Sequence, residues 1–304
     1  MAPPLYRGRF APTPSGPLHF GSLVAAMASY LDACAHGGEW LVRMEDVDPP
    51  RVAPGAADRI LHTLELYGFQ WHSPVMYQSR RGAAYCAALA ELQRLGQVYR
   101  CICSRKTLTE NARRGVDGLV YPGACRALNL DTKHAGMRFR MPAGRAIFDD
   151  AIQGRVACDL VTECGDFILQ RADGVYSYQL AVTVDDAEQG ISHVVRGADL
   201  LTSTPRQIAL QQALGLPAVR YAHLPVALDE HGDKLSKQTL ATAIDAADPL
   251  PALKIAACFL GLMPPAGLAN PDEFWRWAVA AWPSRIARPV RGYRPTPCNS
   301  VSAK

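Results

Sequence analysis

The chain has 304 residues, of which 49% are hydrophobic and 20% charged, and its formal net charge is +4. This composition is typical of a globular protein, and no apolar run is long enough for a membrane helix. The first ten residues lack the basic start and apolar stretch of a signal peptide, so we expect a cytoplasmic protein with no membrane partner. The small positive charge permits an RNA partner without requiring one.

The first elements expected along the chain are an alternation of strands and helices. Apolar runs predict strands over residues 6–11 and 40–44, and helical periodicity predicts helices over residues 20–35 and 55–67. A β-α-β-α opening favours a parallel sheet, because parallel neighbours need a crossover connection.

The pattern resumes after a cysteine-rich segment. One more helix is predicted before that segment, over residues 81–95. After it, a strand, a helix and a strand are predicted over residues 191–197, 204–215 and 221–228. We therefore predict an α/β fold with a Rossmann-like parallel sheet that is split by an insertion.

The predicted organisation has three parts. The catalytic domain comprises residues 1–98 and 187–240, and the insertion comprises residues 99–186. Two helical patterns joined by a Pro/Gly-rich link make residues 241–304 a short helical appendage, which ends in a basic tail. The tail is expected to be solvated, with RNA contact as the alternative.

A proline- and glycine-rich segment precedes the helix predicted to begin at residue 20. Ligands of parallel sheets bind where strands end and helices begin, and a helix N-terminus attracts phosphate. His19 and Gly21 therefore suit a nucleotide, since the histidine can donate a hydrogen bond and the glycine leaves room. In the alternative interpretation the prolines only form a turn and His19 only caps the helix.

A second polar segment, DEHGDKLSKQT, contains Lys234 and Lys237 in a glycine-flanked loop after a strand. Such lysines can close over a polyphosphate. Taken alone, they are better explained as ordinary solvated surface lysines.

The two segments together resemble the paired signatures of class I aminoacyl-tRNA synthetases. HFGS at residues 19–22 corresponds to the first signature and KLSKQ at 234–238 to the second. The blocks GRFAPTPSGPLHFGS, VRMEDVDPPR and VVRGADLL narrow the resemblance to the glutamyl branch, over residues 5–245. Ser22 stands where the signature has its second histidine, and Gln238 where it has its final serine.

The resemblance implies how ATP and its magnesium ion are bound. It assigns His19, Lys234 and Lys237 to catalysis, and the ATP-binding residues to His19, Gly21, Ser22 and Lys237. The reaction that it implies joins the carboxylate of glutamate to the α-phosphorus of ATP and expels pyrophosphate, a step helped by Mg²⁺ and by the lysines.

The resemblance also implies a pocket for glutamate. Arginine can grip a carboxylate with two donors, and a carboxylate can pair with the amino group. The residues assigned to this pocket are Arg9, Phe10, Ala11, Pro12, Thr13, Glu45, Tyr178 and Arg196. A glutamine substrate would leave a buried arginine without a counter-charge, so glutamate is the expected amino acid.

Three cysteines lie at metal-ligand spacing. Cys101, Cys103 and Cys125 suit a tetrahedral zinc ion, and His134 is one candidate for the fourth ligand. The resemblance assigns that position to Tyr121 instead. We expect a structural Zn²⁺ ion, with metal-free thiols as the alternative.

The chain has too few residues after Lys237 for the anticodon-binding body of ordinary glutamyl-tRNA synthetases. In this respect the chain resembles shortened relatives, the glutamyl-queuosine tRNA(Asp) synthetases, which activate glutamate without tRNA and transfer it to the queuosine base of tRNA(Asp). This activity is the expected one, in a monomer. The alternatives are a short enzyme that charges the 3′ end of tRNA(Glu), and a zinc-containing tRNA-binding paralogue without catalysis.

Overall fold

The computed structural model describes residues 5–227 except 105, 108, 110, 111 and 117, then residues 244, 245 and 247–282, and the backbone of 292–293. Lys234 and Lys237, which the sequence assigns to catalysis, lie outside these residues, as does most of the basic tail. None of the described helices combines the length and hydrophobicity needed to span a bilayer.

The central sheet has two sections that lie edge to edge. One section has the strand order β1-β2-β3 and the other the order β11-β12-β8-β9. The backbone N–H of Ser192, next to β11, donates to the carbonyl oxygen of Arg7 on β1 at 3.0 Å, so β1 is central. The strands are β1 (Arg7–Phe10), β2 (Glu39–Met44), β3 (Met76–Tyr77), β8 (Arg145–Asp150), β9 (Gly154–Asp159), β11 (His193–Gly197) and β12 (Arg220–Leu224).

The prediction of a parallel sheet is confirmed for most of these strands and wrong for one. The pairs β1–β2, β2–β3, β11–β12 and β12–β8 are parallel. Strand β9 is antiparallel to β8, which makes the sheet mixed. Only residues 151–153 connect the two strands, and so short a connection permits a hairpin but no crossover.

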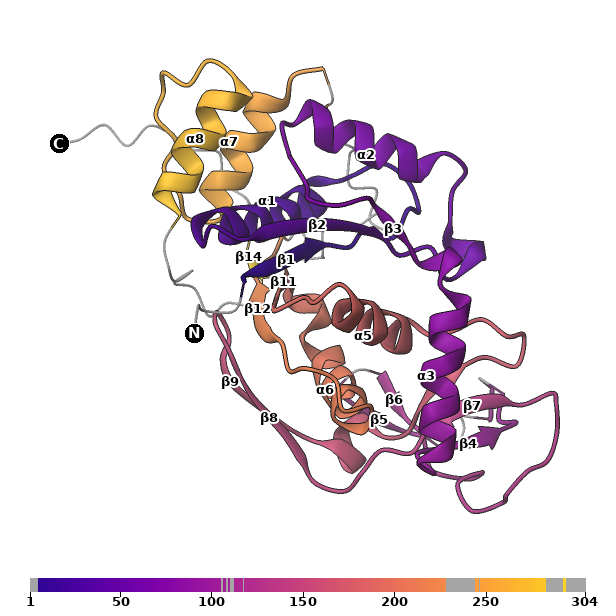
Figure 1. The fold of residues 1–304 in the computed structure, drawn as a ribbon. Coiled ribbons are helices and arrows are strands. Elements are labelled where there is room, and N and C mark those ends of the chain that lie inside the picture. Colours follow the sequence, from indigo (N-terminus) through magenta and orange to yellow (C-terminus); the bar gives the residue numbers. More distant parts are fainter. Residues whose placement is uncertain are drawn as a thin grey trace.

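Helices cover both faces of the central sheet (Figure 1). α1, α2, α7 and α8 lie above strands β1 and β2 in that view, and α5 and α6 lie below them, with α3 along one side. Their bounds are α1 (Phe20–Ala35), α2 (Ala56–Leu66), α3 (Gly82–Arg94), α5 (Tyr178–Glu188), α6 (Thr204–Ala213), α7 (Pro249–Phe259) and α8 (Pro271–Ala281). α1 begins and ends at the predicted residues, whereas α5 was not predicted.

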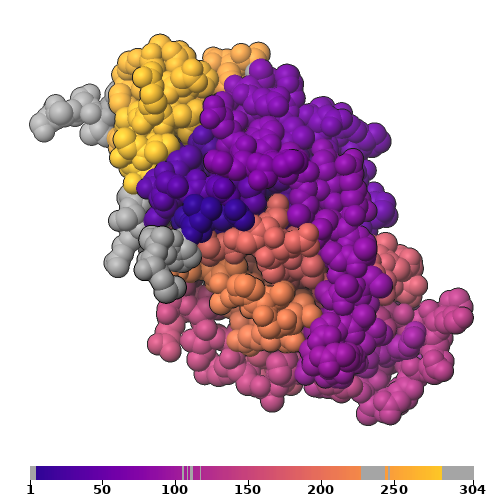
Figure 2. All heavy atoms as spheres, in the orientation of Figure 1, coloured from indigo at the N-terminus to yellow at the C-terminus, as the bar shows by residue number. Residues whose placement is uncertain are grey.

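The C-terminal helices pack against the first helix. The surface view shows the last described helical residues beside the N-terminal part of the chain (Figure 2). The indole N–H of Trp275 on α8 donates to the carbonyl oxygen of Tyr67 at 2.8 Å, and that of Trp282 donates to Asp32 on α1 at 3.0 Å. Leu23, which is fully buried, belongs to the apolar core between α1 and these helices. The predicted helical appendage is therefore docked on the layer that carries α1.

A smaller group of strands lies at the other end of the molecule. Strands β10, β7 and β4 form an antiparallel sheet in that order, and β5 pairs with β6 as a hairpin. The bounds are β4 (Val98–Cys101), β5 (Arg113–Gly115), β6 (Gly118–Val120), β7 (Gly136–Phe139) and β10 (Phe167–Gln170). In addition, β13 (Val226–Ala227) pairs with β14 (Gly292–Tyr293) in a parallel arrangement.

Candidate functional site

A cavity of about 670 Å³ lies where β1, β2, β11 and β12 end and α1 begins. Its lining includes every residue that the sequence analysis assigned to glutamate or ATP within the described part of the chain. These residues are Arg9, Phe10, Ala11, Pro12, Thr13, His19, Gly21, Ser22, Glu45, Tyr178 and Arg196. The structure therefore brings together side chains that are up to 187 positions apart in the sequence.

His19 caps α1 at the edge of this cavity. Its Nδ1 atom accepts the backbone N–H of Ser22 at 3.2 Å, and its Nε2 atom lies 3.1 Å from the Ser22 hydroxyl. The cap satisfies one of the N–H groups that a helix leaves unpaired at its start. His19 thus has the capping role of the alternative interpretation while it also lines the cavity. Ser22, which replaces the second signature histidine, contacts the first one.

Arg9 belongs to a buried network of opposite charges. Its Nε donates to Asp186 at 3.2 Å, and Arg43, which is fully buried, approaches the same carboxylate oxygen at 2.7 Å. Burial opposes the ionisation of Asp186, but Arg9 and Arg43 outweigh it and lower the pKa of that carboxyl. Among the described residues, Asp186 is the one hydrogen-bond partner of the Arg9 guanidinium, whose two terminal nitrogens can therefore receive a carboxylate.

Glu45 is the second acid of this network. Its carboxylate lies 3.6 Å from Arg43, and its side chain is 10% exposed. Burial raises the pKa of Glu45 to about 7, although Arg43 and Arg9 act in the opposite direction. The site therefore has a carboxyl whose charge changes near neutral pH and whose ionised form an ammonium group would stabilise.

Arg196, with an exposed fraction of 5%, is held by neutral acceptors. Its terminal nitrogens donate to the Tyr178 hydroxyl at 3.3 Å, to Thr204 at 2.9 Å and to Gln207 at 2.9 Å. Tyr178 is the first residue of α5, and burial raises its pKa, so it stays a neutral phenol. The described residues place no carboxylate within ion-pair distance of Arg196.

Sequence reasoning missed several residues of the site. Arg43 and Asp186 were not assigned, and Ser15, Arg51 and Asp199 line the cavity as well. Arg43 lies in the VRMED block that carries part of the resemblance, so a signal for it was present. Asp186 lies in α5, and only its position opposite two arginines reveals its importance.

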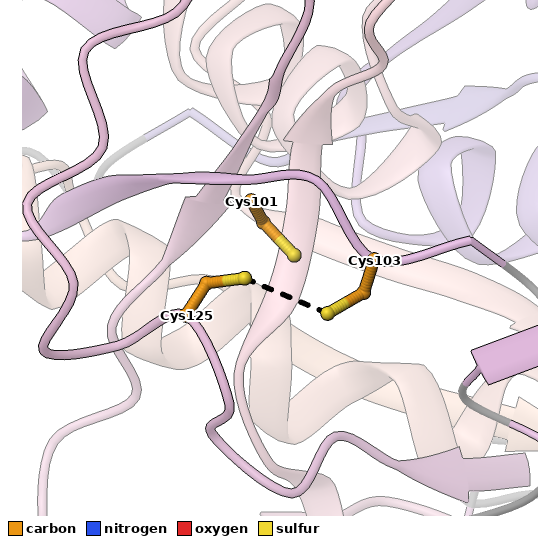
Figure 3. Close-up of side chains that lie close together, drawn as sticks. All are labelled: Cys101, Cys103 and Cys125. Carbon is orange, nitrogen blue, oxygen red and sulfur yellow. Dashed lines mark hydrogen bonds between the residues drawn. The ribbon is translucent and has the colours of Figure 1, made fainter.

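The three predicted metal-binding cysteines converge at the end of β4 (Figure 3). The side chains of Cys101, Cys103 and Cys125 bring their sulfur atoms within 4.8 Å of one another, and those of Cys103 and Cys125 are 3.5 Å apart. The Tyr121 hydroxyl lies 3.5 Å from the sulfurs of Cys101 and Cys103 and accepts the backbone N–H of Cys125 at 2.8 Å.

This donor set fits a tetrahedral metal ion. Zinc–sulfur bonds of about 2.3 Å place the sulfurs of a tetrahedral site about 3.8 Å apart, close to the spacing found here. Arg138 stacks over the ring of Tyr121, with 3.8 Å between its central carbon and the ring centroid, and this contact holds the ring in place. His134 is exposed and is not in the group of ligands that lie close together.

The chain matches the family model described as "tRNA synthetases class I (E and Q), catalytic domain" over residues 6–270. It is 54% identical to the glutamyl-Q tRNA(Asp) synthetase of Chromobacterium violaceum over 283 residues, which are 93% of this chain and 95% of that protein. It is 52% identical to the protein of the same name from Neisseria meningitidis serogroup B over 282 residues, which are 91% and 96% of the two chains.

Two solved structures share the fold. A glutamate-tRNA synthetase of Elizabethkingia anophelis matches with a TM-score of 0.78 at 24% identity, over 95% of this chain and 68% of the other. A glutamate tRNA ligase of Elizabethkingia meningosepticum in complex with its amino acid matches with a TM-score of 0.77 at 25% identity, over 96% and 67%. In both comparisons, this chain aligns with about two thirds of a longer protein.

Proposed function

The chain belongs to the glutamyl-Q tRNA(Asp) synthetase family, a family of ligases within the class I tRNA synthetases, and from this membership we propose its reaction. The enzyme activates glutamate with ATP to form glutamyl-adenylate, without needing tRNA for this step. It then transfers the glutamyl group to the queuosine base of tRNA(Asp). Two anionic substrates must meet in this reaction, so the enzyme has to position them and offset their charge.

One observation carries the proposal: a single cavity is lined by two buried arginines, a partly buried glutamate and the N-terminus of α1. The arginines suit the two carboxylates of a glutamate, and Glu45 suits its ammonium group. The start of α1 suits a phosphate, because its first N–H groups point out of the helix. Amino acid and nucleotide would thus lie side by side at the ends of β1 and β11.

We propose that Arg9 and Arg196 orient glutamate from the neighbouring strands β1 and β11, while Tyr178 and Glu45 fix its remaining polar groups. Activation forms a bond between a carboxylate oxygen and the α-phosphorus and breaks the bond to pyrophosphate. His19 and Ser22 bind ATP beside α1, and Gly21 leaves room above the helix. When bound with ATP, a Mg²⁺ ion would supply charge neutralisation for the departing pyrophosphate.

Lys234 and Lys237 complete the proposed site, although they lie outside the described residues. We expect them to steady the phosphates of ATP. Lys237→Ala should reduce adenylate formation by at least ~100-fold, the scale on which lost transition-state contacts are measured. Zinc content should be unchanged, because the substitution removes none of the four proposed zinc ligands. An unaltered exchange rate would remove the lysine from the mechanism.

The proposed zinc ion is structural. Cys101, Cys103, Cys125 and Tyr121 would hold it, and a bound ion would join β4 to the loop after β6. The cavity-lining residues include none of these four side chains. Metal analysis of the purified protein tests this assignment, and the expected result is one zinc per chain, lost on Cys103→Ser.

Two assays test the function. The first is exchange of labelled pyrophosphate into ATP, with glutamate and with or without tRNA. We expect exchange without tRNA, whereas exchange only with tRNA would favour a short glutamyl-tRNA synthetase. The second is transfer of labelled glutamate to tRNA(Asp) prepared with and without queuosine. Equal labelling of both tRNAs would refute the queuosine assignment.

A further inference from the structure

A buried chain of side chains leads from the cavity into the central sheet. It starts at Arg196 on β11, continues to His223 on β12 and ends at Asp150 on β8. Arg196 and His223 face each other in register, and the exposed fractions of His223 and Asp150 are 0% and 4%. The relay, as we call these three residues, therefore crosses three neighbouring strands.

The hydrogen bonds of the relay determine where its protons lie. Arginine keeps its protons, so the Nε–H of Arg196 donates to Nε2 of His223 at 3.0 Å. Nε2 must then be unprotonated, and the other ring nitrogen carries the hydrogen. Nδ1 of His223 donates it to Asp150 at 2.5 Å. The imidazole is neutral, in agreement with burial as the main cause that lowers its pKa.

Asp150 is itself held in one orientation. Its Oδ1 atom accepts three backbone N–H groups, from Ile152 at 3.0 Å, Gln153 at 2.8 Å and His223 at 3.1 Å. Oδ2, the other carboxylate oxygen, is therefore directed at Nδ1 of His223. Burying two charged residues and a histidine costs free energy that apolar residues of similar size would avoid, and this cost favours a role beyond packing.

We propose that His223 and Asp150 are positioning residues that hold Arg196 as an uncompensated cation for the side-chain carboxylate of glutamate. A carboxylate in direct contact with Arg196 would cancel most of its charge, and the site would then distinguish glutamate poorly from glutamine. The neutral imidazole fixes the guanidinium and keeps the carboxylate one residue further away. This inference deepens the proposed function and rests on it.

Asp150→Asn tests the relay. The backbone N–H groups still select the amide oxygen, so the amide nitrogen faces Nδ1 of His223 and donates to it. The proton of the imidazole must then move to Nε2, where it opposes the Nε–H of Arg196. We expect the KM for glutamate in pyrophosphate exchange to rise roughly 10- to 100-fold, as for other residues that orient a ligand-binding group. The kcat and the KM for ATP should change much less, and the preference for glutamate over glutamine should fall.

Asp166→Asn is the matched control. Asp166 is buried, accepts the hydroxyl of Tyr99 at 2.6 Å and does not line the cavity. Its variant should leave the KM for glutamate unchanged. A second pair compares His223→Gln, which retains an acceptor for Arg196, with His223→Leu, which does not. The rise in the KM for glutamate should be clearly smaller in the His223→Gln variant than in the His223→Leu variant.

Nitrogen NMR of the wild-type protein gives a readout that does not depend on any variant folding well. The His223 signal, assigned by its loss in His223→Gln, should report the tautomer protonated at Nδ1. Protonation at Nε2, or a KM for glutamate within twofold of wild type in folded Asp150→Asn, would overturn the relay. If wild-type enzyme shows no glutamate-dependent exchange, the proposed function fails instead.

Discussion

Two buried polar networks flank the same cavity and are built in opposite ways. On the side of β1 and β2, Arg9, Arg43, Asp186 and Glu45 form direct ion pairs, in which two cations meet two acids. On the side of β11 and β12, the relay separates Arg196 from Asp150 by a neutral imidazole. The first network can adjust its charge at Glu45 when a substrate binds, whereas the relay keeps the charge of Arg196 fixed.

The largest difference is expected when each network loses its central acid. Asp186→Asn removes the one ion-pair partner that the described residues give Arg9 and leaves Arg43 paired with Glu45 alone, so the free energy of unfolding should fall by about 3–5 kcal/mol. Asp150→Asn keeps the three bonds accepted from the backbone and should cost about 1–3 kcal/mol. Urea unfolding of both variants at neutral pH measures the difference. Equal losses would show that the two networks hold their charges in the same way.

The next effect concerns the shape of the cation. Arg196→Lys keeps the positive charge but loses the planar fork that donates to His223, Tyr178 and Gln207. The KM for glutamate should rise about 10- to 100-fold, since a hydrogen bond to a charged group contributes about 1.5–3 kcal/mol. Arg206→Lys is the control, because Arg206 is buried on α6 and donates to the backbone of Cys164. A similar rise in both variants would count against a specific role for the fork.

A tenfold effect is expected from pH at Glu45. Its pKa of about 7 makes the ionised fraction rise about tenfold between pH 6 and pH 8. If Glu45 binds the ammonium group of glutamate, the KM for glutamate should fall by about that factor over this interval. Initial rates of exchange at each pH measure it, with Glu45→Gln as the variant that should show no such dependence. A flat wild-type profile would separate Glu45 from amino-group binding.

The smallest expected effect is on the stability of the Glu45→Gln variant. This substitution should weaken glutamate binding but stabilise the ligand-free protein. The folded-state pKa of Glu45 lies above its usual value of 4.5, so its contribution is present at low pH and is lost as pH rises towards 7. Glu45→Gln should therefore stabilise the ligand-free protein at pH 8, by an amount of the order of 1 kcal/mol. Thermal unfolding measures this gain. A destabilised variant would show that Arg43 holds Glu45 more strongly than burial opposes it.

Local patterns were sufficient to predict most of the elements around the cavity, but not α5. The helical period beginning at Phe20 gave the bounds of α1, because its apolar face is continuous and the segment before it cannot extend the helix. α5 was missed because its buried positions include Thr183, Asp185 and Asp186, whose polarity removes the apolar stripe that marks a helix. Ion pairs of its buried acids, as well as apolar contacts, hold α5 against its neighbours.

Site residues could be predicted from the sequence where they lie in short blocks that resemble the family. Arg9, Glu45 and Arg196 each lie in a block that resembles the family, and the structure places all three on one cavity. Asp150 and His223 lie outside those blocks, and nothing near them in the sequence indicates a polar chain. Their relation follows from the pairing of β8 with β12 and of β12 with β11, which only the folded chain reveals.

The central position of β1 has a consequence for how the chain acquires its site during synthesis. β1 is translated first, but its neighbour β11 follows about 180 residues later, and β12 later still. Until then one edge of β1 has no partner strand, and Arg9 faces an incomplete wall. A nascent chain that stops before β12 therefore still lacks Leu224, Pro225 and Val226 of the cavity lining.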